Sequence, residues 1–237
     1  MVRTIFVWSC IVLATLLLGV VALIAYPFDR KGRIGHRCAR IWGKVALLAN
    51  GVKVRVEGLE RIKGSGPFIF MANHQGSYDI FALLGYLPFH FKWLAKKELF
   101  SIPFLGWTMN AAGYISLDRQ GTRETVEAMN QAAQKIREGM SVVIFPEGSR
   151  SPDGSIQPFK KGGFTLALKA RVPIVPISIA GSREIMPKEK WAASPGEIRI
   201  RVGEPIETES YSTRDRTVLM ERVSETIQRN FEAIHRT

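Results

Sequence analysis

The chain has 237 residues, of which 46% are hydrophobic and 23% charged, and its formal net charge is +12. This composition excludes global disorder, and the length suits one large domain with an appendage. The charge favours an anionic partner, which means a nucleic acid, an anionic lipid or a phosphorylated substrate. Because the sequence has no RNA-binding signature and no long basic tail, we expect no nucleic acid partner. Cys10 and Cys38 make neither a disulfide framework nor a metal motif, which favours a reducing compartment.

The first predicted element is an apolar helix. Residues 5–26 form a stretch of 22 residues without a charge, and a bilayer core takes roughly 20 helical residues. The stretch is too long for a secretory signal peptide, and no small-x-small cleavage site follows it. Only Arg3 precedes it, whereas several cations follow: Arg30, Lys31, Arg33, Arg37, Arg40 and Lys44. The positive-inside rule therefore places the rest of the chain in the cytoplasm.

Residues 34–50 predict a second helix, with basic side chains among apolar ones. This mixture is typical of a helix at a lipid interface, where Trp42 suits the headgroup zone. The two helices form either a hairpin that dips into one leaflet or a membrane span followed by an interfacial helix. Ordinary packing of the second helix against the domain is the alternative. We therefore divide the chain into membrane-associated helices at 1–50 and a globular domain at 51–237.

The globular domain alternates short apolar strands with helices. We predict strands at 52–57, 67–72, 91–95, 114–117, 141–145, 174–179 and 197–202. We predict helices beginning near residue 78 and at 122–138, 164–170 and 213–234. This alternation indicates a layered α/β domain around a largely parallel sheet.

The chemistry centres on residues 73–79, Asn-His-Gln-Gly-Ser-Tyr-Asp, which lie on a strand-to-helix turn. α/β proteins usually place ligand groups at such turns. Here Asp79 can fold back onto the imidazole of His74 and fix its tautomer, which leaves the other ring nitrogen free as a base. We expect Ser77 to cap the helix that follows. A nucleophilic role for Ser77 is less favoured because the chain lacks a G-x-S-x-G elbow.

The spacing of His74 and Asp79 resembles the first motif of the glycerolipid acyltransferases. Three further motifs follow in that family's order, at residues 113–119, 145–150 and 172–177, and the third reads Phe-Pro-Glu-Gly-Ser-Arg. The resemblance covers nearly the whole chain and is strongest to the bacterial members that act on 1-acylglycerol 3-phosphate. Departures such as Gly76, Ser116 and Ser149 remove no charged group, so they affect acceptor preference rather than catalysis.

The resemblance implies transfer of an acyl group from acyl-CoA or acyl carrier protein to the free hydroxyl of lysophosphatidic acid, giving phosphatidic acid. It implies His74 as general base, oriented by Asp79, with no covalent acyl-enzyme, no metal and no cofactor. Arg119 and Arg150 are expected to bind the phosphate bidentately. Glu147 and Lys161 are further substrate-binding candidates, and Gly148 lets backbone amides approach the reacting carbonyl. The expected location is a bacterial inner membrane, with the catalytic domain on the cytoplasmic face and in contact with membrane lipids.

Two other functions remain open at this point. Within the class, the acceptor is glycerol 3-phosphate or another lysophospholipid. Outside it, the chain is a non-catalytic protein that binds anionic lipid through its basic face. The intact His74, Asp79, Arg119 and Arg150 argue against the second alternative. The other histidines, His36, His90 and His235, have no matching carboxylate motif and are expected to be structural or on the surface.

Overall fold

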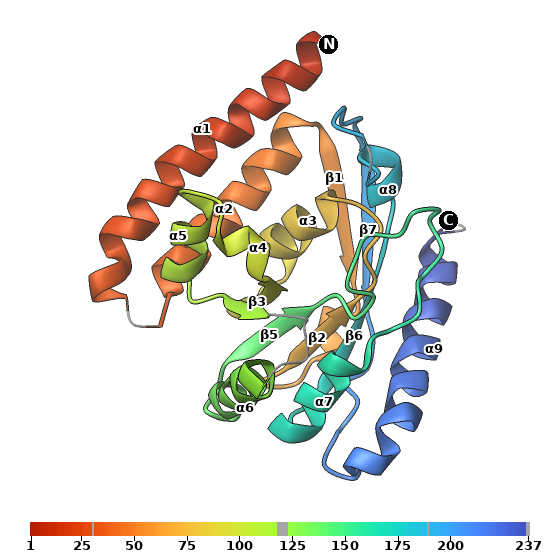
Figure 1. The fold of residues 1–237 in the computed structure, drawn as a ribbon. Coiled ribbons are helices and arrows are strands. Elements are labelled where there is room, and N and C mark those ends of the chain that lie inside the picture. The colour runs from red at the N-terminus through yellow and green to blue at the C-terminus, as the bar shows by residue number, and fades with distance from the viewer. Residues whose placement is uncertain (30, 118–122, 189, 236–237) are drawn as a thin grey trace.

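The computed structural model describes residues 1–29, 31–117, 123–188 and 190–235. Within these residues seven strands form one sheet, in the order β1-β7-β6-β2-β5-β3-β4 (Figure 1). The strands are β1 Val52–Glu57, β2 Ile69–Ala72, β3 Phe91–Lys96, β4 Ile115–Leu117, β5 Ser141–Ile144, β6 Ile174–Ala180 and β7 Gly196–Val202. All neighbours pair in parallel except β6 and β7. The predicted layered α/β fold with a largely parallel sheet is therefore confirmed.

Helices cover both faces of this sheet. They are α1 Val2–Ala25, α2 Arg33–Ala49, α3 Tyr78–Tyr86, α4 Lys97–Phe100, α5 Leu105–Ala111, α6 Arg123–Arg137, α7 Lys161–Ala170, α8 Ser182–Ile185 and α9 Arg216–His235. Short 3-10 turns lie at Tyr26–Phe28, Leu59–Arg61 and Thr213–Asp215. In Figure 1, α1 to α5 lie on one side of the sheet and α6, α7 and α9 on the other.

The central strand β2 shows how the sequence builds two cores. Its four residues are all buried, and their side chains alternate between the faces of the sheet. Phe70 and Ala72 belong to the hydrophobic cluster beneath α2 and α3. Ile69 and Met71 belong to the cluster beneath α6, α7 and α9. Because both faces are covered, the strand carries no polar residue, and its functional groups follow at its carboxyl end.

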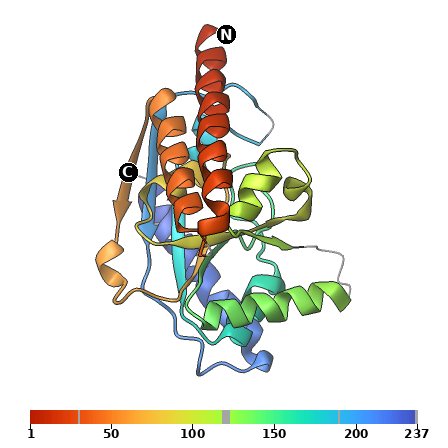
Figure 2. The same cartoon turned by 90° about the vertical axis from the view of Figure 1, so that its left-hand side faces the viewer.

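The two N-terminal helices form an antiparallel hairpin, which Figure 2 shows side by side over the domain. On its inner face α1 contributes Val7 and Ile11 to the same core as β2. Arg3 donates to the backbone oxygen of Asn50 at 2.7 Å and to its Oδ1 at 2.9 Å, which ties the start of α1 to the end of α2. By length and composition, residues 2–28 are apolar enough to cross a membrane.

The outer face of α1 is exposed and apolar along its length. Its exposed large side chains are Val2, Ile5, Phe6, Val12, Leu13, Leu16, Leu17, Val20, Val21 and Ile24. Trp42 of α2, which we expected at a headgroup surface, instead points inward. Its ring nitrogen donates to Thr15 Oγ1 at 2.9 Å, and its ring packs edge-on against Phe81 at a centroid distance of 4.8 Å. That expectation was wrong because α2 turns its aromatic residue toward α1 and α3.

Candidate active site

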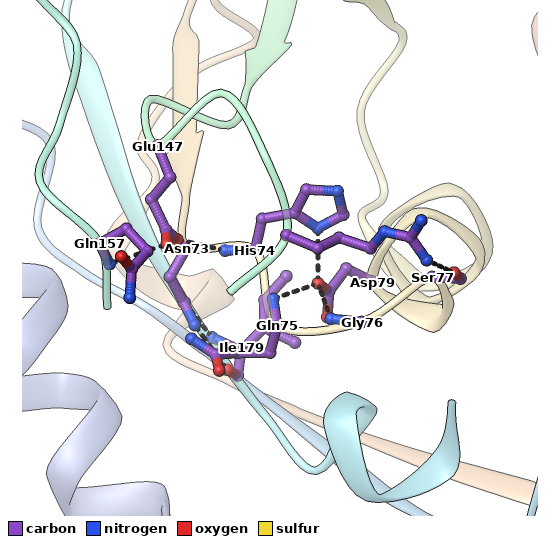
Figure 3. Close-up of polar contacts among 10 residues, drawn as sticks. Asn73, His74, Gln75, Gly76, Ser77, Asp79, Glu147, Gln157 and Ile179 are labelled. Atoms are coloured by element: carbon purple, nitrogen blue, oxygen red, sulfur yellow. Dashed lines mark hydrogen bonds and ion pairs between the residues drawn. The ribbon is translucent and has the colours of Figure 1, made fainter. Parts of the chain in front are cut away.

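The site forms where two parallel neighbours, β2 and β5, end side by side. The chain leaves β2 at Ala72 and β5 at Ile144, so the turns carrying His74 and Glu147 meet at one edge of the sheet. Asn73 anchors the first turn to β6. Its amide nitrogen donates to Ile179 O at 2.8 Å, and its amide oxygen accepts from Ile179 N at 2.7 Å (Figure 3). Because Asn73 is fully buried, this pair fixes the start of the turn rigidly.

His74 and Asp79 meet as the sequence predicts. Asp79 Oδ2 lies 2.8 Å from His74 Nδ1 and also accepts the backbone N–H groups of Gln75 at 2.7 Å and Gly76 at 2.9 Å. Asp79 has no exposed surface, and it lies in the first turn of α3, where the helix dipole favours a negative charge. With Nδ1 held by the carboxylate, Nε2 is the imidazole nitrogen available to a substrate.

Gly76 permits the tight packing of this turn. A Cβ at this position would lie 2.4 Å from the backbone oxygen of Ser182, closer than any real Cβ contact. The turn is thus pressed against the segment after β6. The small hydroxyl residue that is frequent here in the resembling family has no room in this chain.

Ser77 takes the N-cap position of α3, but its side chain makes no capping bond. Its hydroxyl instead accepts a hydrogen bond from Arg150 Nη1. The predicted cap was wrong because Ser77 has helical backbone angles, φ −66° and ψ −25°, instead of the extended angles of a capping residue, and its hydroxyl pairs with the arginine. Ser77 therefore positions Arg150 beside the dyad.

Aromatic rings hold the His74 imidazole from the side. Phe145, at the end of β5, stacks on it with a centroid distance of 3.9 Å and an interplanar angle of 9°. Trp93 stacks behind Phe145 at 5.4 Å. The sequence predicts Trp93 only as a strand residue, and it predicts Phe145 as the end of a strand and the start of the third motif, with no role for either ring. The stack restricts rotation of the imidazole, so its free nitrogen keeps one direction.

Glu147 is buried next to the backbone of His74. Its Oε1 accepts from the backbone N–H of His74 at 2.5 Å, and its Oε2 accepts from the N–H of Gln157 at 2.8 Å (Figure 3). The residue is 2% exposed, and burial raises the pKa of its carboxyl to about 7 despite these two hydrogen bonds. These contacts give Glu147 a positioning role for the His74 backbone, whereas substrate contact by this carboxylate stays a prediction.

Of the other predicted site residues, Gly148 lies in the site, Lys161 does not line the cavity, and Arg119 is not described by the structure. Gly148 has φ 76°, and its N–H donates to Phe145 O at 3.0 Å, so that amide closes the turn. The Lys160 side chain packs on Gly148: a Cβ there would lie 3.2 Å from Lys160 Nζ. Lys161 is exposed at the start of α7 and lies off the cavity described next. Arg119 falls outside the residues that the structure describes.

A cavity of about 510 Å³ opens beside His74, a volume usual for small-molecule sites. Its walls are mostly apolar and come from the helical hairpin and α5, including Leu18, Gly19, Ala22, Ala39, Trp42 and Met109. Its polar lining consists largely of His74, Ser77 and three cationic side chains, Lys96, Arg150 and Lys188, of which Arg150 bonds Ser77 next to the dyad. No acidic side chain lines it in the described part of the chain. The cavity is thus suited to a long apolar ligand with a negatively charged end. Lys96 and Lys188 lie outside the motif turns, so spacing gave no signal for them.

Comparison with known proteins assigns the family. An acyltransferase family model matches residues 53–180, a range that holds the dyad and the motif turns. The chain belongs to the acyltransferase family. It is 34% identical over 200 residues to the chloroplastic 1-acyl-sn-glycerol-3-phosphate acyltransferase BAT2 of Brassica napus, covering 81% of this chain and 58% of the relative. It is 34% identical over 185 residues to the human 1-acyl-sn-glycerol-3-phosphate acyltransferase alpha, covering 78% of this chain and 65% of the relative. The chain therefore spans less than two thirds of the length of these two relatives.

A solved structure extends the likeness to nearly the whole chain. The crystal structure of the 1-acyl-sn-glycerophosphate acyltransferase PlsC from Thermotoga maritima superposes with a TM-score of 0.85 at 29% sequence identity. The match covers 98% of this acyltransferase and 95% of that chain. It therefore includes the helical hairpin as well as the sheet that carries the dyad.

Proposed function

We propose that this acyltransferase transfers a fatty acyl group from an acyl thioester to the free hydroxyl of lysophosphatidic acid, giving phosphatidic acid. One observation carries the proposal: the His74–Asp79 dyad opens at the cationic end of an apolar cavity. The names of the relatives support the same acceptor. Acyl-CoA and acyl carrier protein are both candidate donors, since each presents the same thioester.

The chemistry follows from the geometry of the dyad. A hydroxyl is a poor nucleophile at neutral pH, so its proton must leave in the transition state. His74 Nε2 takes that proton while the hydroxyl oxygen attacks the thioester carbonyl. The C–S bond then breaks, and the imidazolium returns the proton to the leaving thiolate. Asp79 stabilises the charged imidazolium, as the aspartate does in a hydrolase triad. The substrate hydroxyl takes the place of the serine, so the protein supplies no nucleophile of its own.

Release of free thiol tests this proposal. We expect thiol release from acyl-CoA or acyl carrier protein that depends on lysophosphatidic acid. Glycerol 3-phosphate and other lysophospholipids, tried in parallel, identify the acceptor class. Thiol release equal with and without every acceptor would favour a lipid-binding protein or a hydrolase.

Arg150 is the described residue best placed to bind the acceptor phosphate, because Ser77 holds it at the cavity end. Loss of a charge-assisted hydrogen bond costs about 1.5–3 kcal/mol. Arg150→Ala should therefore raise the KM for lysophosphatidic acid at least tenfold more than the KM for the thioester. Arg229→Ala, on the exposed face of α9, is the matched control. A fall in kcat with both KM values unchanged would instead assign Arg150 to the transition state.

We also propose that α1 lies in one leaflet, with the catalytic part on the cytoplasmic side of a bacterial inner membrane. The apolar outer face of α1 supports insertion. The bond from Arg3 to Asn50 supports the single leaflet, since a spanning helix would carry Arg3 to the far side of the bilayer. Tags at the two termini should be accessible from the same side of sealed membrane vesicles. Accessibility from opposite sides would indicate a true span.

A further inference from the structure

A second cavity, of about 230 Å³, lies between the first half of α1 and residues 186–188 and 190–193, which follow α8. It shares three wall residues with the larger cavity: Ser77, Arg150 and Lys188. The two cavities therefore meet at the side chains next to the dyad. They leave that point in different directions, one toward α2 and α5 and the other toward the start of α1.

The walls of the second cavity combine cationic and aromatic groups. Arg150, Lys188 and Lys190 supply positive charge, and no acidic side chain lines it among the described residues. Trp8 and Trp191 form its outer rim: the Trp8 ring nitrogen donates to Trp191 O at 2.9 Å, and the ring centroids lie 5.8 Å apart. This pairing holds Trp191 against α1.

The rim lies where a lipid surface would meet the protein. Trp191 is 77% exposed and has exposed lysines, Lys188 and Lys190, close to it in sequence. Tryptophan and lysine are typical of the headgroup zone of a membrane. The exposed apolar face of α1, with Ile5 and Phe6, continues from this rim. A lipid can therefore pass from the membrane into this cavity without crossing water.

The proposed reaction needs room for two amphiphiles at one histidine. The thioester carries a long acyl chain, and the acceptor carries a phosphate and an acyl chain of its own. The larger cavity is the long apolar one and suits the chain being transferred. The smaller cavity has less than half that volume, but it has its own cations and faces lipid. Its size suits a phosphoglycerol head and the first part of a chain whose remainder stays in the bilayer.

We propose that the second cavity is the acceptor subsite, in which Lys188 together with Arg150 holds the phosphate of the lysophospholipid and the start of its acyl chain lies against Trp8 and Trp191. This inference rests on the proposed acyl transfer and refines it. The acceptor hydroxyl then reaches His74 from the α1 side while the thioester carbonyl reaches it from the larger cavity. Lys190 adds positive charge at the rim.

Kinetics with separate donor and acceptor titrations test this subsite. Lys188→Ala should raise the KM for lysophosphatidic acid about tenfold and leave the KM for the thioester unchanged within twofold. Trp191→Ala should raise the KM for long-chain lysophosphatidic acid severalfold more than that for glycerol 3-phosphate, which has no chain. Lys63→Ala, an exposed lysine outside both cavities, is the matched control.

Photocrosslinking gives a readout that does not depend on turnover. A lysophosphatidic acid with a diazirine near the start of its chain should label residues 7–11 and 191–193 of the wild-type enzyme. A diazirine at the end of the chain of an acyl thioester should label residues 18–22 and 105–112. The labelling by lysophosphatidic acid should weaken in Lys188→Ala and persist in Lys63→Ala.

The outcomes separate this inference from the function on which it rests. If the wild-type enzyme shows no acceptor-dependent thiol release, the proposed function fails and the subsite falls with it. If the wild type is active but Lys188→Ala behaves like Lys63→Ala, only the subsite is wrong. A rise in the thioester KM instead, or labelling of residues 18–22 by the lysophospholipid chain, would reverse the two assignments and overturn the inference.

Discussion

Two polar clusters in this acyltransferase each combine histidine with a carboxylate but have different roles. The first is the dyad site, made of His74, Asp79 and Glu147. The second, which we call the hairpin clasp, consists of Asp29, His36, His90 and Lys92 and lies where α1 turns into α2. The dyad site has one member, His74, on a cavity wall, whereas no clasp residue lines either cavity. Access to a ligand, rather than the residue types, separates a site from a structural cluster.

The polar side chains of the clasp form hydrogen bonds with backbone groups. Asp29 accepts the first three N–H groups of α2, and Lys92 Nζ donates to Lys31 O at 3.0 Å and Gly32 O at 3.2 Å. Burial lowers the pKa of Lys92 to about 8 and, with the nearby charges of His90 and Lys92, lowers the pKa of His36 to about 3. A neutral His36 donates through Nε2 to Phe89 O at 3.1 Å. Strongly shifted pKa values therefore occur in this structural cluster as well as in the dyad site, so they do not by themselves identify a functional site.

The largest expected effect comes from His74. His74→Ala removes the base, so we expect kcat to fall ~10²–10⁴-fold. Asp79→Asn should also be severely impaired, because a neutral amide no longer fixes the His74 tautomer or stabilises the charged imidazolium. Thiol release measures the loss, and circular dichroism checks the fold. His36→Ala is the matched control at the clasp and should lose stability rather than turnover. If His74→Ala kept a tenth of the wild-type kcat, His74 would not be the base, and the functional contrast between the dyad site and the clasp would be wrong.

The clasp should give the opposite pattern. Lys92→Met keeps the length of the side chain but removes the donor to the backbone oxygens of Lys31, Gly32 and Ala112, at a cost of about 1–3 kcal/mol. We expect the free energy of unfolding to fall by that amount, while kcat changes less than threefold. Chemical denaturation in detergent measures the first quantity, with Lys53→Met on the exposed side of β1 as the control. A loss of kcat comparable to that of His74→Ala would mean that the clasp takes part in catalysis.

Glu147 shares features of both clusters. It lies in the dyad site, but like the clasp residues it forms its hydrogen bonds with backbone groups. Its pKa is raised from 4.5 to about 7, so the folded state binds its proton more tightly than the unfolded state does. The stability that results is fully present below pH 4.5 and is lost as the pH rises through about 7. The free energy of unfolding of the wild type, relative to Glu147→Gln, should therefore fall between pH 4.5 and pH 7. Urea unfolding at several pH values measures this difference, and a difference that rises with pH would contradict the assigned direction.

The sequence located the dyad site well because its determinants are local. His74 and Asp79 lie within one turn, and the motif at 145–150 follows a strand whose buried, apolar character is evident. Since the carboxyl ends of parallel strands meet at one edge, predicting the strands also predicted that these motifs converge. Element boundaries followed from the same alternation, so β1 and β7 were placed to within one residue.

What the sequence could not show depends on distant segments. Lys188 reaches the site from beyond β6, and no motif marks it. Trp42 and Ser77 each had a plausible local role, at the interface and as a cap, but tertiary partners took both side chains. The cavity does have a signal in the sequence. Four small residues within apolar or amphipathic helices line it: Gly19, Ala22, Gly35 and Ala39. Small side chains in such helices signal a close approach or a hollow.

The smallest expected effect concerns the larger cavity, through which a ligand can reach the dyad site but not the clasp. Ala22 lines the cavity and is 5% exposed, whereas its neighbour Val21 points outward and is 48% exposed. Ala22→Leu should shorten the space for the transferred chain, and each methylene that no longer fits loses about 0.8 kcal/mol of burial. We expect kcat/KM for the longest thioesters to fall severalfold relative to shorter ones, with the rate on the shortest donor retained. Val21→Leu, one residue away on the outer face, should leave the preference unchanged. If both variants shifted the chain-length preference equally, the cause would be a general change in membrane binding. If neither did, the acyl chain would not lie against this part of α1, and access through the cavity would no longer explain why one cluster is a site and the other a fastening.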